Sequence, residues 1–152
     1  MLMSGKQVYF EEVSVGMEIQ SLVKKPTNVQ LFRFSALTWN AHRIHYDKDY
    51  VVTEGYPDVL VQAHLHGAFL TQLVTDWIGE GGTLERLGWS NRMYANPGDT
   101  LTCTGKVTGK YVKDGRSYVE LEIVERNQRG EVCAPGTATV TLPSRSGKAP
   151  AR

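Results

Sequence analysis

The stretch QAHLHGAFLTQLVTDWIGE, residues 62–80, decides the fold of this chain of 152 residues. Its large apolar side chains recur four residues apart in two neighbouring rows: Leu65, Phe69, Leu73 and Trp77, then Leu70, Val74 and Ile78. So wide an apolar face is typical of a helix that is surrounded by protein on most sides. The glycines of residues 79–82, GEGG, end the pattern. We therefore expect one long, buried helix near the middle of the chain.

Everything after this helix reads as β-structure. Four segments show alternation and β-branched enrichment, and turn formers separate them at residues 96–99, 113–115 and 127–130. These segments span residues 84–95, 100–112, 116–126 and 131–142. A sheet with one apolar face needs a cover, and residues 62–80 form the only long helix available. The prediction is a single α+β domain in which a curved antiparallel sheet wraps around that helix.

The first half of the chain predicts shorter elements. Residues 8–19 read as a strand or turn that leads into the domain. Thr27 is a suitable N-cap for a helix over residues 28–39. Four apolar residues of this helix recur at helical spacing: Val29, Phe32, Ala36 and Trp39. By this spacing Trp39 is expected to be a core residue. Asp47 is expected to cap a short turn over residues 48–51. We expect the domain to span residues 9–142, between a flexible arm (1–8) and a flexible tail (143–152).

Composition excludes several classes of protein. Hydrophobic residues make up 41% of the chain and charged residues 22%, with a formal net charge of +1 and no one-sided basic footprint of a nucleic-acid binder. The apolar runs are far shorter than the roughly 20 residues that a membrane helix needs, and the first residues lack a signal peptide's apolar region. We expect a cytoplasmic protein without nucleic-acid or membrane partners. Cys103 and Cys133 are expected to be buried thiols.

All four histidines of the chain lie within one window of 25 residues: His42, His45, His64 and His66. Such clustering suggests proton chemistry or metal binding, because the imidazole pKa lies closest to neutrality. Four imidazoles could suit zinc or copper. However, His64 and His66 fall on a predicted helix, where residues two apart diverge by about 200°. We therefore expect proton chemistry, with no metal and no cofactor.

Two segments carry a family resemblance. TWNAHRIHYD, residues 38–47, resembles the S-G-D-x-N-P-x-H-x-D motif of MaoC-like (R)-specific enoyl-CoA hydratases, which have the hot-dog fold. Residues 91–140, with their PGD turn and closing G-x-A-x-V strand, are similar to a second region of that family. The chain departs from the motif at Asn40, where most members carry aspartate, and at His42 and Arg43. In this respect it resembles the branch of fungal mitochondrial-type dehydratases and mesaconyl-type C4-dicarboxylyl-CoA hydratases.

The resemblance implies an acyl-CoA thioester as substrate and assigns roles to residues. His45 would be the catalytic acid and base, with Asn40 orienting water or the imidazole, and either His45 works alone or His42 is the second titratable group. The donor to the thioester oxygen would lie at residues 62–64, where Gln62 and Ala63 replace the family's histidine and glycine and His64 follows. Small residues of the helix, Gly67 among them, would leave room for a bulky acyl chain. Pairing is expected, as a homodimer or as a heterodimer with a second hot-dog subunit.

Two other functions remain open at this stage. The same fold hosts acyl-CoA thioesterases, which usually place an Asp or Glu opposite the helix N-terminus. Alternatively, the loss of the motif aspartate at Asn40 would suit a non-catalytic subunit that binds acyl-CoA and supports an active partner. The residue that separates these readings is His45, since only an enzyme of the hydratase type depends on it.

Overall fold

The computed structural model describes residues 7–145, and its longest helix lies where the sequence places it. The elements, in chain order, are η1 (Phe10–Glu12), β1 (Glu18–Lys24), α1 (Asn28–Thr38), η2 (Arg43–His45), α2 (Lys48–Thr53), α3 (Ala63–Ile78), β2 (Thr83–Trp89), β3 (Leu101–Lys113), β4 (Arg116–Arg126) and β5 (Val132–Thr141). The prediction of one long helix followed by four strands is confirmed.

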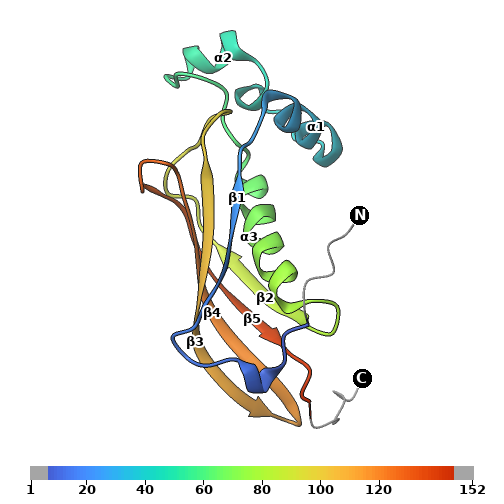
Figure 1. Cartoon of the computed structure of the whole chain (residues 1–152). Helices are drawn as coiled ribbons and strands as arrows, with labels where there is room; N and C mark the ends of the chain where they lie inside the picture. Colours follow the sequence, from blue (N-terminus) through green and yellow to red (C-terminus); the bar gives the residue numbers. More distant parts are fainter. Residues whose placement is uncertain (1–6, 146–152) are drawn as a thin grey trace.

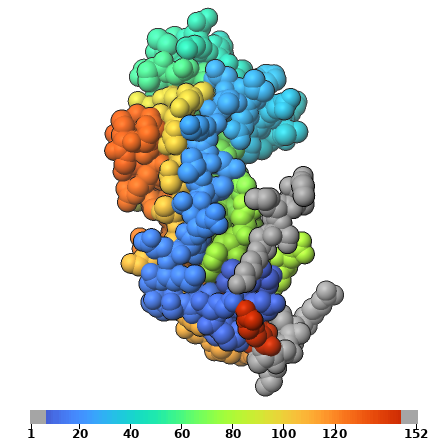
Figure 2. Space-filling model, in the orientation of Figure 1, coloured from blue at the N-terminus to red at the C-terminus, as the bar shows by residue number. Residues whose placement is uncertain are grey.

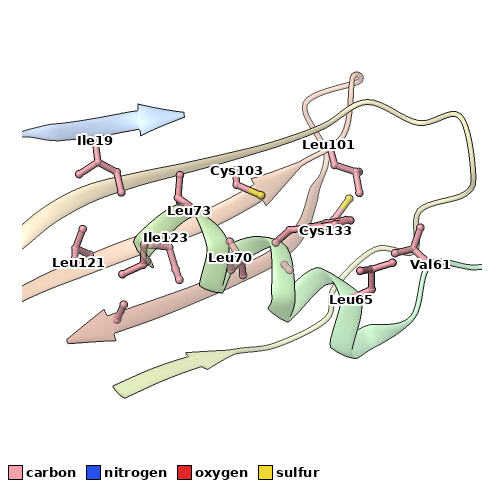
Figure 3. Packing of buried hydrophobic residues seen from close by; sticks show 14 of the residues in the cluster. Ile19, Val61, Leu65, Leu70, Leu73, Leu101, Cys103, Leu121, Ile123 and Cys133 are labelled. Carbon is pink, nitrogen blue, oxygen red and sulfur yellow. The ribbon is translucent and has the colours of Figure 1, made fainter. Parts of the chain in front are cut away.

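The five strands form one antiparallel sheet in the order β1-β3-β4-β5-β2. Helix α3 lies along one face of this sheet and contacts all five strands (Figure 1). Six of the seven residues of the predicted apolar face are buried, and the seventh, Trp77, is partly buried. Figure 3 shows three of the six, Leu65, Leu70 and Leu73, packed among residues of the strands. The expected sheet wrapped around a central helix, the hot-dog arrangement, is therefore confirmed.

The core is made of aliphatic side chains, the ring of Phe69 and two thiols. Strands β3 and β4 contribute the residues opposite the middle of α3, which include Leu101, Cys103, Leu121 and Ile123. The cysteines are free and buried, as expected from the sequence. Among residues 7–145, none of the helices has both the length and the apolar character needed to cross a bilayer.

Helices α1 and α2 project at one end of the molecule, beyond the end of the sheet (Figure 2). Their starting points follow the local signals in the sequence. Thr27 Oγ1 accepts a hydrogen bond from Gln30 N–H at 3.2 Å, and Asp47 Oδ1 accepts one from Tyr50 N–H at 3.0 Å. Trp39 ends α1 in the left-handed conformation, with φ 54°. The chain then turns sharply into the segment that carries the motif histidines.

The prediction that Trp39 of α1 is a core residue is wrong. Trp39 is 89% exposed, and Val29, Phe32 and Ala36 are exposed too, whereas Leu31 and Ser35 are the buried residues of this helix. Both stripes have helical spacing, and the protein interior covers the one that contains Ser35.

Two strand boundaries also differ from the sequence-based expectation. The segment expected as a lead-in over residues 8–19 contains the turn η1, and strand β1 starts only at Glu18. The strand expected over residues 84–95 runs from Thr83 and ends at Trp89. From there the backbone leaves β2 and continues to the PGD turn.

The described parts of the expected arm and tail contact the domain. Gln7 Nε2 donates to Ile78 O at 2.8 Å, and Gly81 N–H donates to Gln7 Oε1 at 2.7 Å. Phe10 N–H donates to Pro143 O at 3.0 Å. Residues 1–6 and 146–152, on which the expectation of flexibility mainly falls, lie outside the described residues.

Candidate active site

His45 is held in one orientation by the segment that precedes α3. It ends the short turn η2, is only 8% exposed, and its Nδ1 lies 2.8 Å from the carbonyl oxygen of Leu60. A carbonyl oxygen can only accept, so Nδ1 carries the hydrogen and Nε2 keeps a free lone pair. Leu60 N–H in turn donates to Ile44 O at 2.9 Å, which fixes the two segments to each other. His45 therefore has the tautomer of a general base.

Burial lowers the pKa of His45 below its ordinary value. The hydrogen bond to the Leu60 carbonyl opposes this shift in part, and the neighbouring imidazole of His42 adds to it. Since the pKa is lowered from a value already near 6.5, the ring is neutral at neutral pH. A neutral imidazole is the form that can accept a proton from water.

Asn40 follows α1 directly and is held by backbone contacts. Its N–H donates to Ser35 O at 2.9 Å, and its Oδ1 accepts from His42 N–H at 3.3 Å. Because the carbonyl end of the side chain is used in this turn, the Nδ2 amide group is the end left to act as a donor. Asn40 can therefore orient a water molecule or hydroxyl group, but it cannot take its proton.

His45 and Asn40 open onto two adjoining hollows, of about 370 Å³ and 300 Å³. Phe32 and Tyr46 line both. His45 lines the larger and Asn40 the smaller. Together their walls include the apolar stripe of α1. Val29 lines the larger hollow, Ala36 and Trp39 line the smaller, and Phe32 lines both. The apolar residues exposed on α1 are thus part of the surface next to the two candidate catalytic residues.

The N-terminus of α3 presents free backbone amides. Leu65 N–H and His66 N–H both donate to the carbonyl of the N-cap residue Gln62. This leaves the amides of Ala63 and His64 without an acceptor inside the helix, and both residues are exposed. The side chain of Gln62 does not cap the helix. Amides at a helix start, together with the helix dipole, favour an anionic oxygen.

His42 lies beside His45 on the exposed side of the turn. The two ring centroids are 6.2 Å apart in an edge-to-face arrangement, and His42 Nδ1 accepts from Ile44 N–H at 3.4 Å. Because Nδ1 is used in this hydrogen bond, Nε2 is the ring nitrogen of His42 that remains for other contacts. The structure thus brings a second imidazole next to the first, as one of the two alternatives requires.

His64 and His66 point in different directions from α3, as their helical spacing predicts. His64 is exposed and meets the ring of Trp89 edge-on, with centroids 6.3 Å apart. His66 is buried and its Nδ1 contacts Oε1 of Glu125. Within residues 7–145, no three His, Cys, Asp or Glu side chains are grouped as a metal site would need.

Gly67 is covered by Trp89. A Cβ atom on Gly67 would lie 2.3–2.6 Å from three atoms of the indole ring, far inside ordinary contact distance. The space that the sequence analysis assigned to an acyl chain is therefore occupied by this ring.

A buried polar group in the core was missed from the sequence. Glu125 of β4 is fully buried, contacts His66, and accepts from Cys103 Sγ at 3.7 Å. Burial, followed by the charge of Glu125, raises the pKa of both thiols, that of Cys133 to about 11. Strand alternation could have revealed Glu125, because it continues the inward-facing row of Val119, Leu121 and Ile123.

Residues 15–96, more than half of the chain and including every candidate residue described above, match the family of hydroxyacyl-thioester dehydratases type 2. The chain belongs to this family. It is therefore an enzyme of the hydratase and dehydratase class, related to the MaoC-like proteins that the motif resembles. The match ends at Asn96, so the strands β3 to β5 lie outside it.

Individual relatives agree with this placement. Over 102 residues, the chain is 31% identical to the 3-oxo-4,17-pregnadiene-20-carboxyl-CoA hydratase beta subunit of Mycobacterium tuberculosis, covering 67% of this chain and 74% of that one. A stretch of 44 residues, 28% of the chain, is 57% identical to mesaconyl-C(4)-CoA hydratase of Chloroflexus aurantiacus but spans only 16% of that protein. The crystal structure of a MaoC-like dehydratase from Rhodospirillum rubrum superposes with a TM-score of 0.79 at 20% identity, covering 91% of this chain and 98% of that one.

Proposed function

We propose that the protein catalyses the (R)-specific hydration of 2-enoyl-CoA thioesters and the reverse dehydration of 3-hydroxyacyl-CoA. One observation carries this proposal: His45, buried and hydrogen-bonded to Leu60 through Nδ1, keeps Nε2 free on the surface that also holds Asn40. The names of the relatives, all CoA-thioester hydratases, support the choice of substrate class.

The reaction needs a base, an acid and a site for negative charge. Nε2 of His45 removes a proton from water while the water oxygen forms a bond to Cβ of the enoyl group. The electron pair of the carbon–carbon double bond moves to the thioester, which becomes an enolate. The amides of Ala63 and His64 donate to its oxygen. The imidazolium then returns the proton to Cα, so the product carries the whole water molecule and His45 is restored.

Asn40 replaces the family's aspartate in this scheme. Its Nδ2 donates to the attacking water and directs a lone pair of the water oxygen toward Cβ, while His45 alone receives the proton. His42, whose ring lies 6.2 Å from that of His45, is the alternative second titratable group. The acyl chain beyond Cβ lies against the apolar stripe of α1 that borders both residues.

The exposed stripe also bears on the assembly. Trp39 and Leu37, at the end of α1, are 89% and 86% exposed. Large apolar side chains that are exposed together to water are unfavourable in an isolated chain. We propose that a second hot-dog subunit covers this end, in a homodimer or a heterodimer. The mycobacterial relative is itself named as a beta subunit, which favours a second candidate function: the chain acts as one subunit of a two-component hydratase.

The test is the loss of enoyl-thioester absorbance with crotonyl-CoA and a panel of bulkier enoyl-CoA esters. Wild type, His45→Ala and His42→Ala are compared, with Gln72→Ala, at a half-buried position of α3 that lines neither hollow, as control. The proposal expects turnover that His45→Ala reduces by about 10² to 10⁴-fold. A similar loss in His42→Ala assigns it the second proton role.

Other outcomes decide against the proposal. Release of free CoA without hydration would identify a thioesterase. Absence of turnover on every ester, in a folded protein that still binds them, would favour the non-catalytic subunit.

A further inference from the structure

The residues just before α3 anchor the base and the oxyanion donors, which form one wall of the proposed site. Leu60 O accepts the hydrogen bond from His45, and Gln62, two residues later, is the N-cap whose helix presents the free amides. Any displacement of this segment therefore moves the base and the oxyanion donors together. Asn40, on the other wall, needs a separate link to the segment.

The side chain of Gln62 supplies that link. It is fully buried, and its Nε2 donates to Leu31 O at 2.7 Å and to Ser35 Oγ at 2.9 Å, both on α1. Ser35 O accepts from Asn40 N–H at 2.9 Å. Gln62 and Ser35 thus connect the start of α3 to the backbone of Asn40.

From these contacts we infer that Gln62 is a positioning residue, which sets the location of Asn40 relative to the amides of Ala63 and His64. This inference rests on the proposed function. Gln62 was expected to contact substrate, but its carboxamide lines neither hollow and points into the contact between α1 and α3.

The choice of residue supports a positioning role over simple packing. Oε1 of Gln62 is buried without a hydrogen-bond partner among the described residues. A buried, unpaired oxygen is unfavourable, so an apolar side chain of the same size would suit stability alone better. What glutamine adds is a pair of directed N–H donors, and both bind the helix that precedes Asn40.

The first experiment compares Gln62→Met with wild type in the enoyl-CoA hydration assay. Methionine has similar size and fills the same space, but it cannot donate to Leu31 O or Ser35 Oγ. We expect kcat to fall by about 10 to 10²-fold, since a misplacement of about 1 Å is enough for such a loss. KM should change by less than about threefold, because the apolar walls and the α3 amides remain. Gln72→Met, at a half-buried glutamine of the same helix that lines neither hollow, is the matched control and should leave both unchanged.

A second measurement separates positioning from loss of stability. Hydrogen exchange at the Asn40 amide, which is bonded to Ser35 O, should be faster in Gln62→Met, while amides in the middle of α3 keep their protection. Ser35→Ala combined with Gln62→Met should have little more effect on kcat than Gln62→Met alone, because both changes break one chain of contacts.

The possible results distinguish failure of this inference from failure of the proposed function. The inference is overturned if Gln62→Met leaves kcat unchanged. It is also overturned if hydrogen exchange becomes faster throughout the protein while the folded enzyme keeps its kcat. In both cases the proposed function still stands. If wild type hydrates no ester, the proposed function fails. The exchange at Asn40 then still decides whether Gln62 fixes the position of that residue, and unaltered exchange refutes it.

Discussion

Replacing Gly67 by alanine sets two opposing effects against each other. In the interior of a helix, alanine is more favourable than glycine by about 1 kcal/mol, so propensity alone predicts a more stable protein. The structure opposes this gain, since the new Cβ would lie 2.3 Å from the nearest atom of the Trp89 ring and 2.5–2.6 Å from two others. Ordinary contact begins near 3.4 Å, so the ring has to retreat by about 1 Å.

The magnitude follows from these two terms. Forcing an extra carbon into a packed contact costs about 1–3 kcal/mol. A rigid indole absorbs the shift less easily than a flexible chain, so the cost here falls in the upper half of that range, about 2–3 kcal/mol. We therefore expect Gly67→Ala to lose about 1–2 kcal/mol after the gain in propensity. This corresponds to a fall in Tm of roughly 2–8 °C for a protein of this length.

The assay is thermal and urea unfolding of three variants. Ala68→Gly, at the next and exposed position of α3, measures the propensity term without the ring. In the background Trp89→Leu, which frees the space, Gly67→Ala should be neutral or stabilising. A raised Tm for Gly67→Ala alone would refute the packing argument. If such a stable variant also lost turnover on bulky enoyl-CoA esters, Gly67 would instead border the acyl chain.

Three further predictions concern groups in the site and the core. Because burial lowers the pKa of His45, the acidic limb of the kcat/KM profile should have its midpoint below about 6.5, and a midpoint above 7 would contradict a neutral base. The free energy of unfolding should also fall below that pH, because the unfolded chain then binds a proton that folded His45 does not. Glu125→Ala leaves His66 buried without its partner and should cost about 3–5 kcal/mol in urea unfolding; a loss below about 1 kcal/mol would show that the pair is not needed. The thiols of Cys103 and Cys133, whose pKa values are raised by burial, should react with a thiol reagent only after denaturation, and rapid labelling of native protein would argue against their burial.

Signals that act over a few residues predicted local structure well. Thr27 and Asp47 begin helices because each side chain needs only the amide three residues ahead. The apolar face of α3 is so wide that few arrangements other than a covering sheet could bury it. The resemblance of residues 38–47 then located His45 and Asn40, which the structure places on adjoining hollows.

Contacts between segments far apart in the sequence could not be predicted from such local signals. Gln62 meets Ser35 across 27 residues, and Glu125 meets His66 across 59. Nothing in the immediate neighbourhood of Gln62 distinguishes a buried amide that holds α1 from one that faces a substrate. The burial of Glu125 could have been predicted from strand alternation, since Glu125 occupies an inward-facing position of its strand. A charged residue at such a position implies a buried partner.

The reversed face of α1 shows why helical spacing alone cannot assign a core. Leu31 and Ser35 are four residues apart, and so are Phe32 and Ala36, one position further round the helix. Helical spacing predicts that Trp39, on the more apolar stripe, is buried, but the side chain of Gln62 donates to Leu31 O and Ser35 Oγ and the interior covers that side instead. The apolar stripe is left to line the surface next to Asn40 and His45. Periodicity identifies a face that avoids water, but a substrate or a second subunit can cover that face as well as the protein's own interior.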